Sequence, residues 1–384
     1  DGMDSSPQGR HRDVPRLWKA EEPSINEFEE EESAMKLSAI EERLVYCVDL
    51  AKREFQVHVY TERGALVKKA RMQRKAFQSF LVDVAKTPKG TVVMEACGSA
   101  HFWARLARAQ GHEVKLVPAQ FVAQRRIGSK TDGNDADGIF AVYADPRVRP
   151  VPIKTLAQQD LMALHNQREL LVCQRTQCRN QIRGLLAERG VVQAQGERGL
   201  SLLLQTCHES AEVTADLQEV VADIVEHLRL IEQQIERIER KLAVIAQKDE
   251  VARRVDSIHC VGVITATAVA AHYGNRLDRF ANCRQFAASI GLAPGEHSSG
   301  EKRQLTGITK RGNEYLRKLL VQCAQVVLQN CQERSDPSSL LAQRLNGKRR
   351  NTIVIAIANR IARTIYAVIK RGENYRHHPV AAAA

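Results

Sequence analysis

Short apolar runs and amphipathic stretches alternate after residue 42, which predicts a mixed α/β domain over residues 43–155. Three strands come first: residues 44–49 are an apolar run, residues 55–60 alternate, and Gly64 turns the chain into the third strand. The next elements are a helix at 75–86, a strand at 91–95, a helix at 100–110, a strand at 113–117, a basic loop around 124–126, and a helix that begins near Asn134. Three strands before the first helix are typical of an RNase H-like domain and not of a plain Rossmann unit.

Residues 156–250 predict two long helices that form a coiled-coil region. The first helix covers 156–189, with arginines between its apolar positions, and the second covers 216–248. Apolar residues in the second helix follow steps of four and three, the spacing of a heptad seam: Leu217, Val221, Ile224, Leu228, Ile231, Ile235, Ile238, Leu242 and Ile245. Such a helix is about 50 Å long at 1.5 Å per residue, too long for the interior of one small domain. We therefore expect an arm that pairs with another helix across subunits.

Residues 251–375 predict a third, mainly helical domain. An apolar segment with a glycine turn and small residues, 258–267, is typical of a helix-hairpin-helix-like element, whose backbone N–H groups can contact phosphate. Helices follow at 279–290, 313–330 and 352–370, with a polar stretch rich in Gly, Ser, Lys and Arg at 291–311. Arg360 and Arg363 interrupt the most apolar helix, so no membrane contact is expected.

Charge and cysteine content narrow the functional classes. The net charge is +12, and the acid-rich residues 1–42, expected to be a disordered leader, make the rest of the chain more basic still. A basic body of this kind favours nucleic acid as the partner. The nine cysteines include no CxxC pair, which is typical of reduced thiols in a cytoplasmic protein. The basic residues expected to contact nucleic acid are Arg125, Arg126, Lys130, Arg175, Arg179, Arg183, Lys302, Arg303, Lys310, Arg311, Arg317, Lys348, Arg349 and Arg350.

Four carboxylates occupy matched positions in the first domain. Asp49 ends the first strand and Glu95 ends the fourth, and these strands are neighbours in an RNase H-like sheet. Asp132 and Asp135 are three residues apart at the start of the last helix, so they share one helix face. Converging carboxylates repel one another unless cations lie between them, and hard oxygen ligands suit Mg²⁺ or Mn²⁺. The arrangement predicts a two-metal phosphoryl-transfer site.

A second candidate for chemistry is the serine pair Ser298 and Ser299, which lies before a glycine in the polar stretch of the third domain. A phosphate can approach a serine beside glycine, and the basic residues that follow would stabilise its charge. From composition alone, such a segment is also an ordinary surface loop.

The chain resembles the DEDD-type insertion-sequence transposases of the IS110 family, and more closely its IS1111 branch. The resemblance covers residues 45–370 and rests on several blocks in order: Val48-Asp49, 94–98 (MEACG), 130–136 (KTDGNDA), 180–188 (NQIRGLLAE), 286–294 (FAASIGLAP), 298–300 (SSG) and 307–317 (GITKRGNEYLR). Gly295-Glu296, where basic residues are common, and Asn313, where Asp is frequent, depart from the family pattern, and we expect neither departure to affect the chemistry.

The resemblance implies an RNA-guided DNA recombinase with a RuvC-like domain, a coiled coil and a transposase domain with a nucleophilic serine. Asp49, Glu95, Asp132 and Asp135 would be its acidic set, and Ser299, which precedes the glycine, its nucleophile, with Ser298 as the alternative. The implied partners are a guide (bridge-type) non-coding RNA, donor and target double-stranded DNA, and further copies of the chain, from dimer to tetramer, with composite sites between subunits. The implied location is the bacterial cytoplasm, with the nucleoid.

Two other functions stay open at this level. A RuvC-like nuclease would cut DNA junctions with metal-activated water and form no covalent intermediate. A catalytically silent nucleic-acid-binding protein would need only the heptads and the basic helices. The serine segment argues against the first, and the four carboxylates together with the serine argue against the second.

Overall fold

The structure, a computed structural model, describes residues 40–83, 87–125, 132–299, 304–330 and 347–376, together with Leu37 and Leu341; for residues 132–134 it describes the backbone only. Most of the predicted acidic leader lies outside these residues. The chain divides into two compact units, one up to Val151 and one from Pro152.

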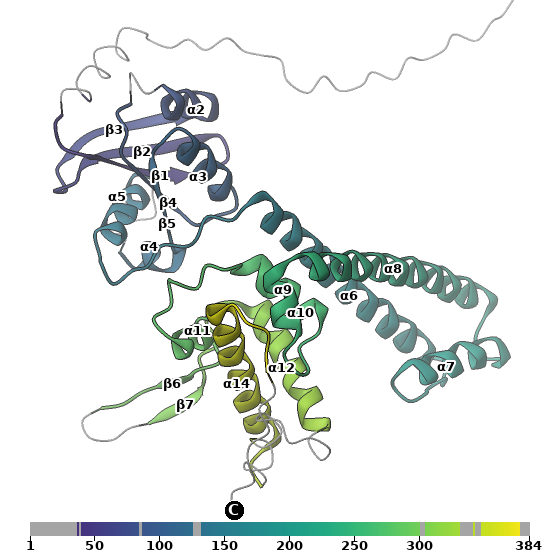
Figure 1. The fold of residues 1–384 in the computed structure, drawn as a ribbon. Coiled ribbons are helices and arrows are strands. Elements are labelled where there is room, and N and C mark those ends of the chain that lie inside the picture. Colours follow the sequence, from purple (N-terminus) through teal and green to yellow (C-terminus); the bar gives the residue numbers. More distant parts are fainter. Residues whose placement is uncertain are drawn as a thin grey trace, which may run out of the picture. The chain divides into compact units, whose positions relative to one another are not determined.

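A five-stranded sheet forms the centre of the first unit (Figure 1). Its strands are β1 (Leu44–Leu50), β2 (Glu54–Thr61), β3 (Leu66–Gln73), β4 (Thr91–Glu95) and β5 (Glu113–Val117), in the order β3-β2-β1-β4-β5. The first three strands are antiparallel, while β4 runs parallel to both β1 and β5. The structure confirms the predicted succession of three strands and the predicted neighbourhood of the first and fourth strands, and the fold is consistent with an RNase H-like domain.

Helices cover both faces of this sheet. On one face, α2 (Arg74–Val82) and α3 (Ala100–Ala109) pack through Phe77 and Trp103, whose rings meet Phe55 of β2 edge to face at 5.1 Å. On the other face, α5 (Asp132–Tyr143) contacts β1, β2 and β4. The prediction of a basic loop around 124–126 is wrong for residues 124 and 125, because Ala119–Arg125 form a short helix, α4. This helix packs against α5 through the buried Val122.

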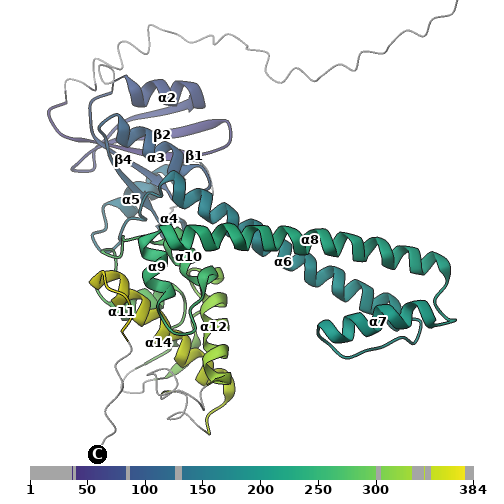
Figure 2. The same cartoon turned by 45° about the vertical axis from the view of Figure 1, so that its right-hand side comes forward.

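The second unit begins with a helical arm, which is most extended in Figure 2. Its helices are α6 (Leu156–Ala187), α7 (Glu197–Glu209) and α8 (Ala215–Lys248), and α6 and α8 lie side by side. The start of α6 is fixed by a capping box, in which the Thr155 hydroxyl accepts from the Gln158 backbone N–H and the Gln158 side chain accepts from the Thr155 backbone N–H. The two long helices match the predicted ranges, whereas α7 was not predicted.

The apolar stripe of α8 is buried within its own chain. Ile231, Ile235 and Leu242 are at most 5% exposed and belong to the same apolar cluster as Ile182 and Leu186 of α6. Two ion pairs join the helices above this seam, Arg168 to Glu239 and Arg179 to Glu232. The structure therefore differs from the expected pairing across subunits: α8 does pair with another helix, but α6 of the same chain covers the stripe.

We expect the double substitution Ile231→Glu/Ile238→Glu to destabilise the arm by several kcal/mol, because it places two carboxylates in the apolar seam between α6 and α8. Loss of helical circular dichroism at a lower temperature would show this. The matched control is Leu230→Glu/Val244→Glu, which adds the same charges at α8 positions that are each 50% exposed. Equal melting of the two double variants would mean that the seam does not hold the arm together.

The rest of the second unit is mainly helical, as predicted. Its elements are α9 (Glu250–Asp256), α10 (Val263–His272), α11 (Cys283–Ser289), α12 (Glu314–Gln329), α14 (Arg350–Arg371) and a two-stranded hairpin of β6 (Pro294–Glu296) and β7 (Leu305–Ile308). By length and composition alone α14 could cross a membrane, but half of its most apolar stretch is buried, and it packs on α11 and α12 as core helices do. The segment 258–267, predicted to be helix-hairpin-helix-like, covers the turn after α9 and the first part of α10.

Candidate active site

The parallel pairing of β1 with β4 brings two of the predicted carboxylates side by side. The register pairs Cys47 with Val93 and Val48 with Met94, so the next two positions are Asp49 and Glu95. Alternation along each strand places Asp49 on the same face as Cys47, and Glu95 on the same face as Val93. Cys47 and Val93 lie in the apolar cluster under α5, so both carboxylates belong to the face that α5 covers.

Helix α5 carries a third acid, Asp135, on its sheet-facing side. Ile139 and Val142 are buried in the cluster with Val93, and Asp135 precedes them by four and seven residues, which puts it on the same helical stripe. Asp132 begins α5, and its side chain lies outside the described residues. Strand register and helix period thus assign Asp49, Glu95 and Asp135 to one face of the sheet near the ends of β1 and β4. These three residues, together with Asp132 at the start of α5, form the acidic edge.

The donor chemistry of this acidic edge fits a hard divalent cation, because all four groups are carboxylates. Asp49, Glu95 and Asp135 are the members with described side chains. Among the described side chains, no three metal-ligating groups lie close enough together to hold an ion. The backbone therefore brings Asp49, Glu95 and Asp135 to one edge of the sheet.

A partly buried hydrogen-bond network next to the acidic edge fixes α5 against β2. The Asp137 carboxylate accepts hydrogen bonds from the Tyr60 hydroxyl and, at 2.6 Å, from Nδ1 of His58. Burial lowers the pKa of His58, so its ring is neutral at pH 7, with Nδ1 as donor and Nε2 facing the Gln56 amide at 3.3 Å. Burial alone would raise the pKa of Asp137, but the hydrogen bonds from Tyr60 and His58 outweigh burial and lower it.

This network was not predicted. Its sequence signal is a histidine in an alternating strand and a third aspartate two residues after Asp135, and neither position identifies its partner. The network positions α5 relative to β1, because β2, which carries His58, pairs with β1: His58 is opposite Cys47, and Gln56 is opposite Asp49. Asp137 therefore holds the first turns of α5 beside the strand that carries Asp49.

The serine segment lies on the hairpin of β6 and β7, where the sequence predicted only a polar stretch. Ser298 and Ser299 are both exposed. The Ser298 hydroxyl donates to Oε1 of Glu296 at 2.6 Å and accepts from the Gln304 backbone N–H at 3.3 Å. Glu296 was expected not to affect the chemistry, but its carboxylate lies against Ser298, one of the two candidate nucleophiles. The Ser299 side chain makes no hydrogen bond to the described residues.

The base of the hairpin is closed by two close backbone approaches at glycine. Gly291 and Gly312 have φ of +78° and +83°, and a Cβ atom on Gly312 would lie 1.9 Å from the Ser289 carbonyl oxygen. Arg317 strengthens this junction, because its Nη1 donates to the Ile290 carbonyl at 2.9 Å. The ends of the serine hairpin are therefore fixed against the ends of α11 and α12.

We expect Gly312→Ala to lower the free energy of unfolding by about 2 kcal/mol or more, because the new Cβ forces both a left-handed conformation and a backbone clash. Chemical denaturation would measure the change. The matched control is Gly307→Ala on β7, where the conformation is ordinary and nothing lies within 4 Å of the added Cβ. A Gly312 variant as stable as the Gly307 variant would show that the junction adjusts without cost.

The basic residues predicted to contact nucleic acid differ in their partners and in their exposure. Several of these side chains already have partners: Arg125 bonds Asp145 and the Ala141 carbonyl, Arg179 pairs with Glu197 and Glu232, Arg183 donates to three carbonyls of the loop before α7, and Arg317 holds the hairpin. Arg175 is partly buried, and the exposed members are Lys310, Arg311, Lys348, Arg349 and Arg350. Arg126, Lys130, Lys302 and Arg303 lie outside the described residues.

Comparison with protein families gives two matches that together span both units. Residues 47–189 match a family model described as a transposase, DEDD_Tnp_IS110. Residues 252–338 match a second model, described as the transposase IS116/IS110/IS902 family. The first range contains all four acids of the acidic edge, and the second contains the serine hairpin.

Curated relatives extend the similarity over nearly the whole chain. A probable family 20 transposase of Pseudomonas aeruginosa is 37% identical over 86% of this chain and 97% of its own length. The transposase for insertion sequence element IS1111A of Coxiella burnetii is 37% identical over 86% of this chain and 90% of its own length. The transposase for insertion sequence element IS1328 of Yersinia enterocolitica is 35% identical over 85% of this chain and 96% of its own length.

Proposed function

Because this chain belongs to the IS116/IS110/IS902 family of insertion-sequence transposases, we propose that it is an RNA-guided DNA transposase that exchanges strands through a phosphoserine intermediate. The observation that supports this most directly is the shared face of Asp49, Glu95 and Asp135 at the β1–β4 edge, combined with an exposed serine pair on a braced hairpin. A nuclease that used only water would need the first feature and not the second.

The proposed reaction is a phosphoryl transfer to serine. The hydroxyl oxygen of Ser299, or of Ser298, attacks the phosphorus of the scissile phosphodiester, an O–P bond forms, and the strand's own oxygen leaves with a proton. The phosphoserine ester conserves the bond energy, so a hydroxyl of the second DNA strand can reverse the step and rejoin the ends without ATP. Mg²⁺, or Mn²⁺, held by Asp49, Glu95, Asp132 and Asp135, would supply electrostatic stabilisation of the charged oxygens.

The residues of this chain have separate tasks in the proposal. The acidic edge binds the cation, the Asp137–His58 network holds α5 so that Asp135 stays beside β1, and the glycine junction positions the serine hairpin. Glu296 can take the proton of Ser298 directly, since the two side chains already share a hydrogen bond. Exposed basic residues such as Lys310 and Arg311 next to the hairpin would attract the phosphate backbone.

The proposed partners are donor and target double-stranded DNA, a guide RNA of the bridge type, and further copies of the chain in a dimer or tetramer. The test is to purify the protein from cells that carry the whole insertion element and to sequence the nucleic acid that copurifies. We expect one structured non-coding RNA from the element to be strongly enriched, and recombination in vitro to require that RNA. Recombination that proceeds without any RNA would refute guidance, while absence of recombination under all conditions would refute the transposase activity.

A further inference from the structure

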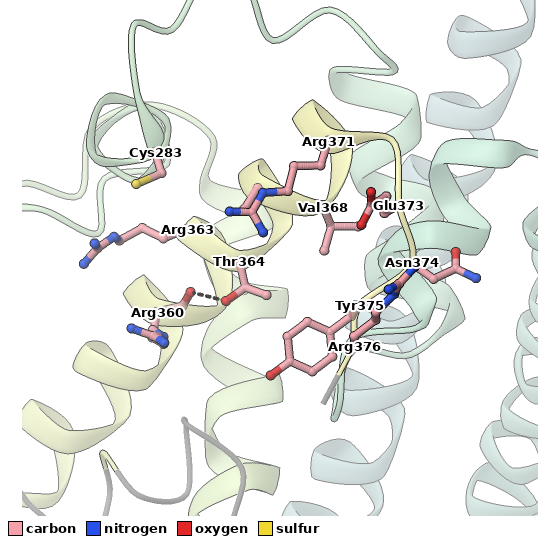
Figure 3. Close-up of a pocket in the computed structure, with 11 residues that line it drawn as sticks. Cys283, Arg360, Arg363, Thr364, Val368, Arg371, Glu373, Asn374, Tyr375 and Arg376 are labelled. Atoms are coloured by element: carbon pink, nitrogen blue, oxygen red, sulfur yellow. Dashed lines mark hydrogen bonds between the residues drawn. The ribbon is translucent and has the colours of Figure 1, made fainter. Parts of the chain in front are cut away.

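Four arginines gather in a groove along α14 that the proposed function does not use. The groove has a volume of about 350 Å³ and lies between the carboxyl-terminal half of α14 and the segment that follows it (Figure 3). Arg360, Arg363 and Arg371 come from the helix and Arg376 from the segment, and the lining contains one carboxylate, Glu373. The groove is therefore strongly cationic.

Helix periodicity and a chain reversal build this groove. Arg360, Arg363, Thr364, Ala367 and Arg371 are spaced by three, four, seven and eleven residues from the first, which places them on one stripe of α14. The helix ends at Gly372, whose φ of +70° turns the chain back. The Tyr375 backbone N–H then donates to the Ser257 hydroxyl at 2.8 Å, which fixes the returning segment as the second wall.

Within the described part of the chain, the arginines of the groove differ from other arginines of this unit in their intramolecular partners. Arg168, Arg179 and Arg254 are paired with glutamates, and Arg317 donates to backbone carbonyls. By contrast, no ion pair joins the groove arginines to any residue that the structure describes. Guanidinium groups that pair with no described carboxylate can pair instead with an anionic ligand.

A contribution to helix stability explains the position of only one of the three arginines of α14. A cation near a helix carboxyl terminus offsets the helix dipole, and Arg371 occupies such a position. Arg360 and Arg363 are two or more turns from the end, and α14 contains no aspartate or glutamate with which they could pair along the helix. Both arginines line the groove and not the apolar face of α14, so their charges are available to a ligand in the groove.

The length of the arginine row points to a polymer and not to a small anion. Eleven residues separate Arg360 from Arg371, which is about 16 Å along the helix axis. Nucleic acid presents one phosphate per roughly 3.4 Å of rise on each strand, so the row spans several consecutive phosphates. Guanidinium groups form paired hydrogen bonds with phosphate oxygens, which suits them to this ligand. We propose that the α14 groove binds the sugar–phosphate backbone of a nucleic-acid strand.

The test measures binding to the full chain by fluorescence anisotropy at several salt concentrations, with two labelled probes, a DNA duplex and a single-stranded RNA. The variant Arg360→Gln/Arg371→Gln removes two exposed charges and leaves the core intact. Its matched control is Arg237→Gln/Arg240→Gln, which removes the same charge from exposed positions of α8. Thermal melting of both variants checks that each is folded.

We expect the groove variant to reduce the slope of log affinity against log salt by about 2, because each lost phosphate contact removes close to one unit, and to lower affinity at least about tenfold. The control should change the slope much less. A reduction on the DNA probe alone, or on the RNA probe alone, identifies which strand occupies the groove. Equal slopes for groove variant and control on both probes would overturn the proposal.

Arg363 provides a second, independent variant. Arg363→Lys keeps the charge and removes the guanidinium fork, so it should weaken binding while the salt slope stays close to that of the wild type. Binding of Glu62→Gln protein to the same probes should equal that of the wild type, because Glu62 is an exposed turn residue outside both the groove and the acidic edge. A failed groove test therefore leaves the proposed catalytic function untouched, and a failed recombination assay leaves the groove testable.

Discussion

Asp49→Asn and Asp135→Asn are each expected to lower transposition at least about a hundredfold, because each removes one carboxylate from the acidic edge and a catalytic cation contributes several kcal/mol to phosphoryl transfer. The substitution keeps the size of the side chain and removes its charge. Recombination of a donor and a target plasmid, counted by sequencing across the junctions, is the measurement.

The matched control for this prediction is Glu62→Gln, which removes one charge from an exposed turn of the same unit. It should recombine like the wild type. Titration with Mn²⁺, followed by calorimetry, gives a readout that does not depend on activity: binding should weaken in both aspartate variants and not in the control. Near wild-type recombination by either aspartate variant would mean that the acidic edge is not the metal site.

The nucleophile should be revealed by covalent protein–DNA adducts, which denaturing gels detect when target, donor and RNA are all present. We expect Ser299→Ala to abolish the adduct, because the ester cannot form without the attacking hydroxyl. Ser298→Ala should retain it. The reverse pattern would assign the nucleophile to Ser298, whose hydroxyl already donates to Glu296.

A third variant sharpens this choice. Glu296→Gln keeps a hydrogen-bond acceptor near Ser298 and removes the group that could take its proton. If Ser298 attacks, adduct formation should slow by about 10² or more and should regain rate at higher pH; if Ser299 attacks, the effect should be small. Adducts that persist in both serine variants would refute the serine mechanism and favour a nuclease that uses water.

Much of the acidic edge could be predicted from the sequence because it depends on local order. Three strands before the first helix indicated the RNase H-like sheet, and the parallel register of β1 with β4 confirms that Asp49 and Glu95 end neighbouring strands. The placement of Asp135 follows from helix period alone, since Ile139 and Val142 face the same cluster. A strand end and a helix stripe are properties of short segments, which is why they could be recognised without the fold.

Other features depended on which surfaces meet. The heptad spacing of α8 showed that one face is buried, but not that α6 of the same chain covers it. Helix α7 and the β6–β7 hairpin were missed, because both depend on close backbone approaches at glycine, such as Gly199 against Ala194 and Gly312 against Ser289, which no sequence pattern shows. The sequence predicted no role for Glu296 in the chemistry, whereas the hairpin places its carboxylate beside the Ser298 hydroxyl.

The sequence by itself determined the succession of strands and helices in the first unit, the two long helices, and the strand-end and helix-start positions of the carboxylates, because each of these follows from the pattern of apolar residues along one segment. Only the tertiary structure decided which helix covers α8, what the Asp137 carboxylate binds, and how Arg376 joins the arginines of α14. These contacts link positions far apart in the chain. Periodicity reports that a face is buried or charged, whereas its partner is set by the free energy of packing the whole fold.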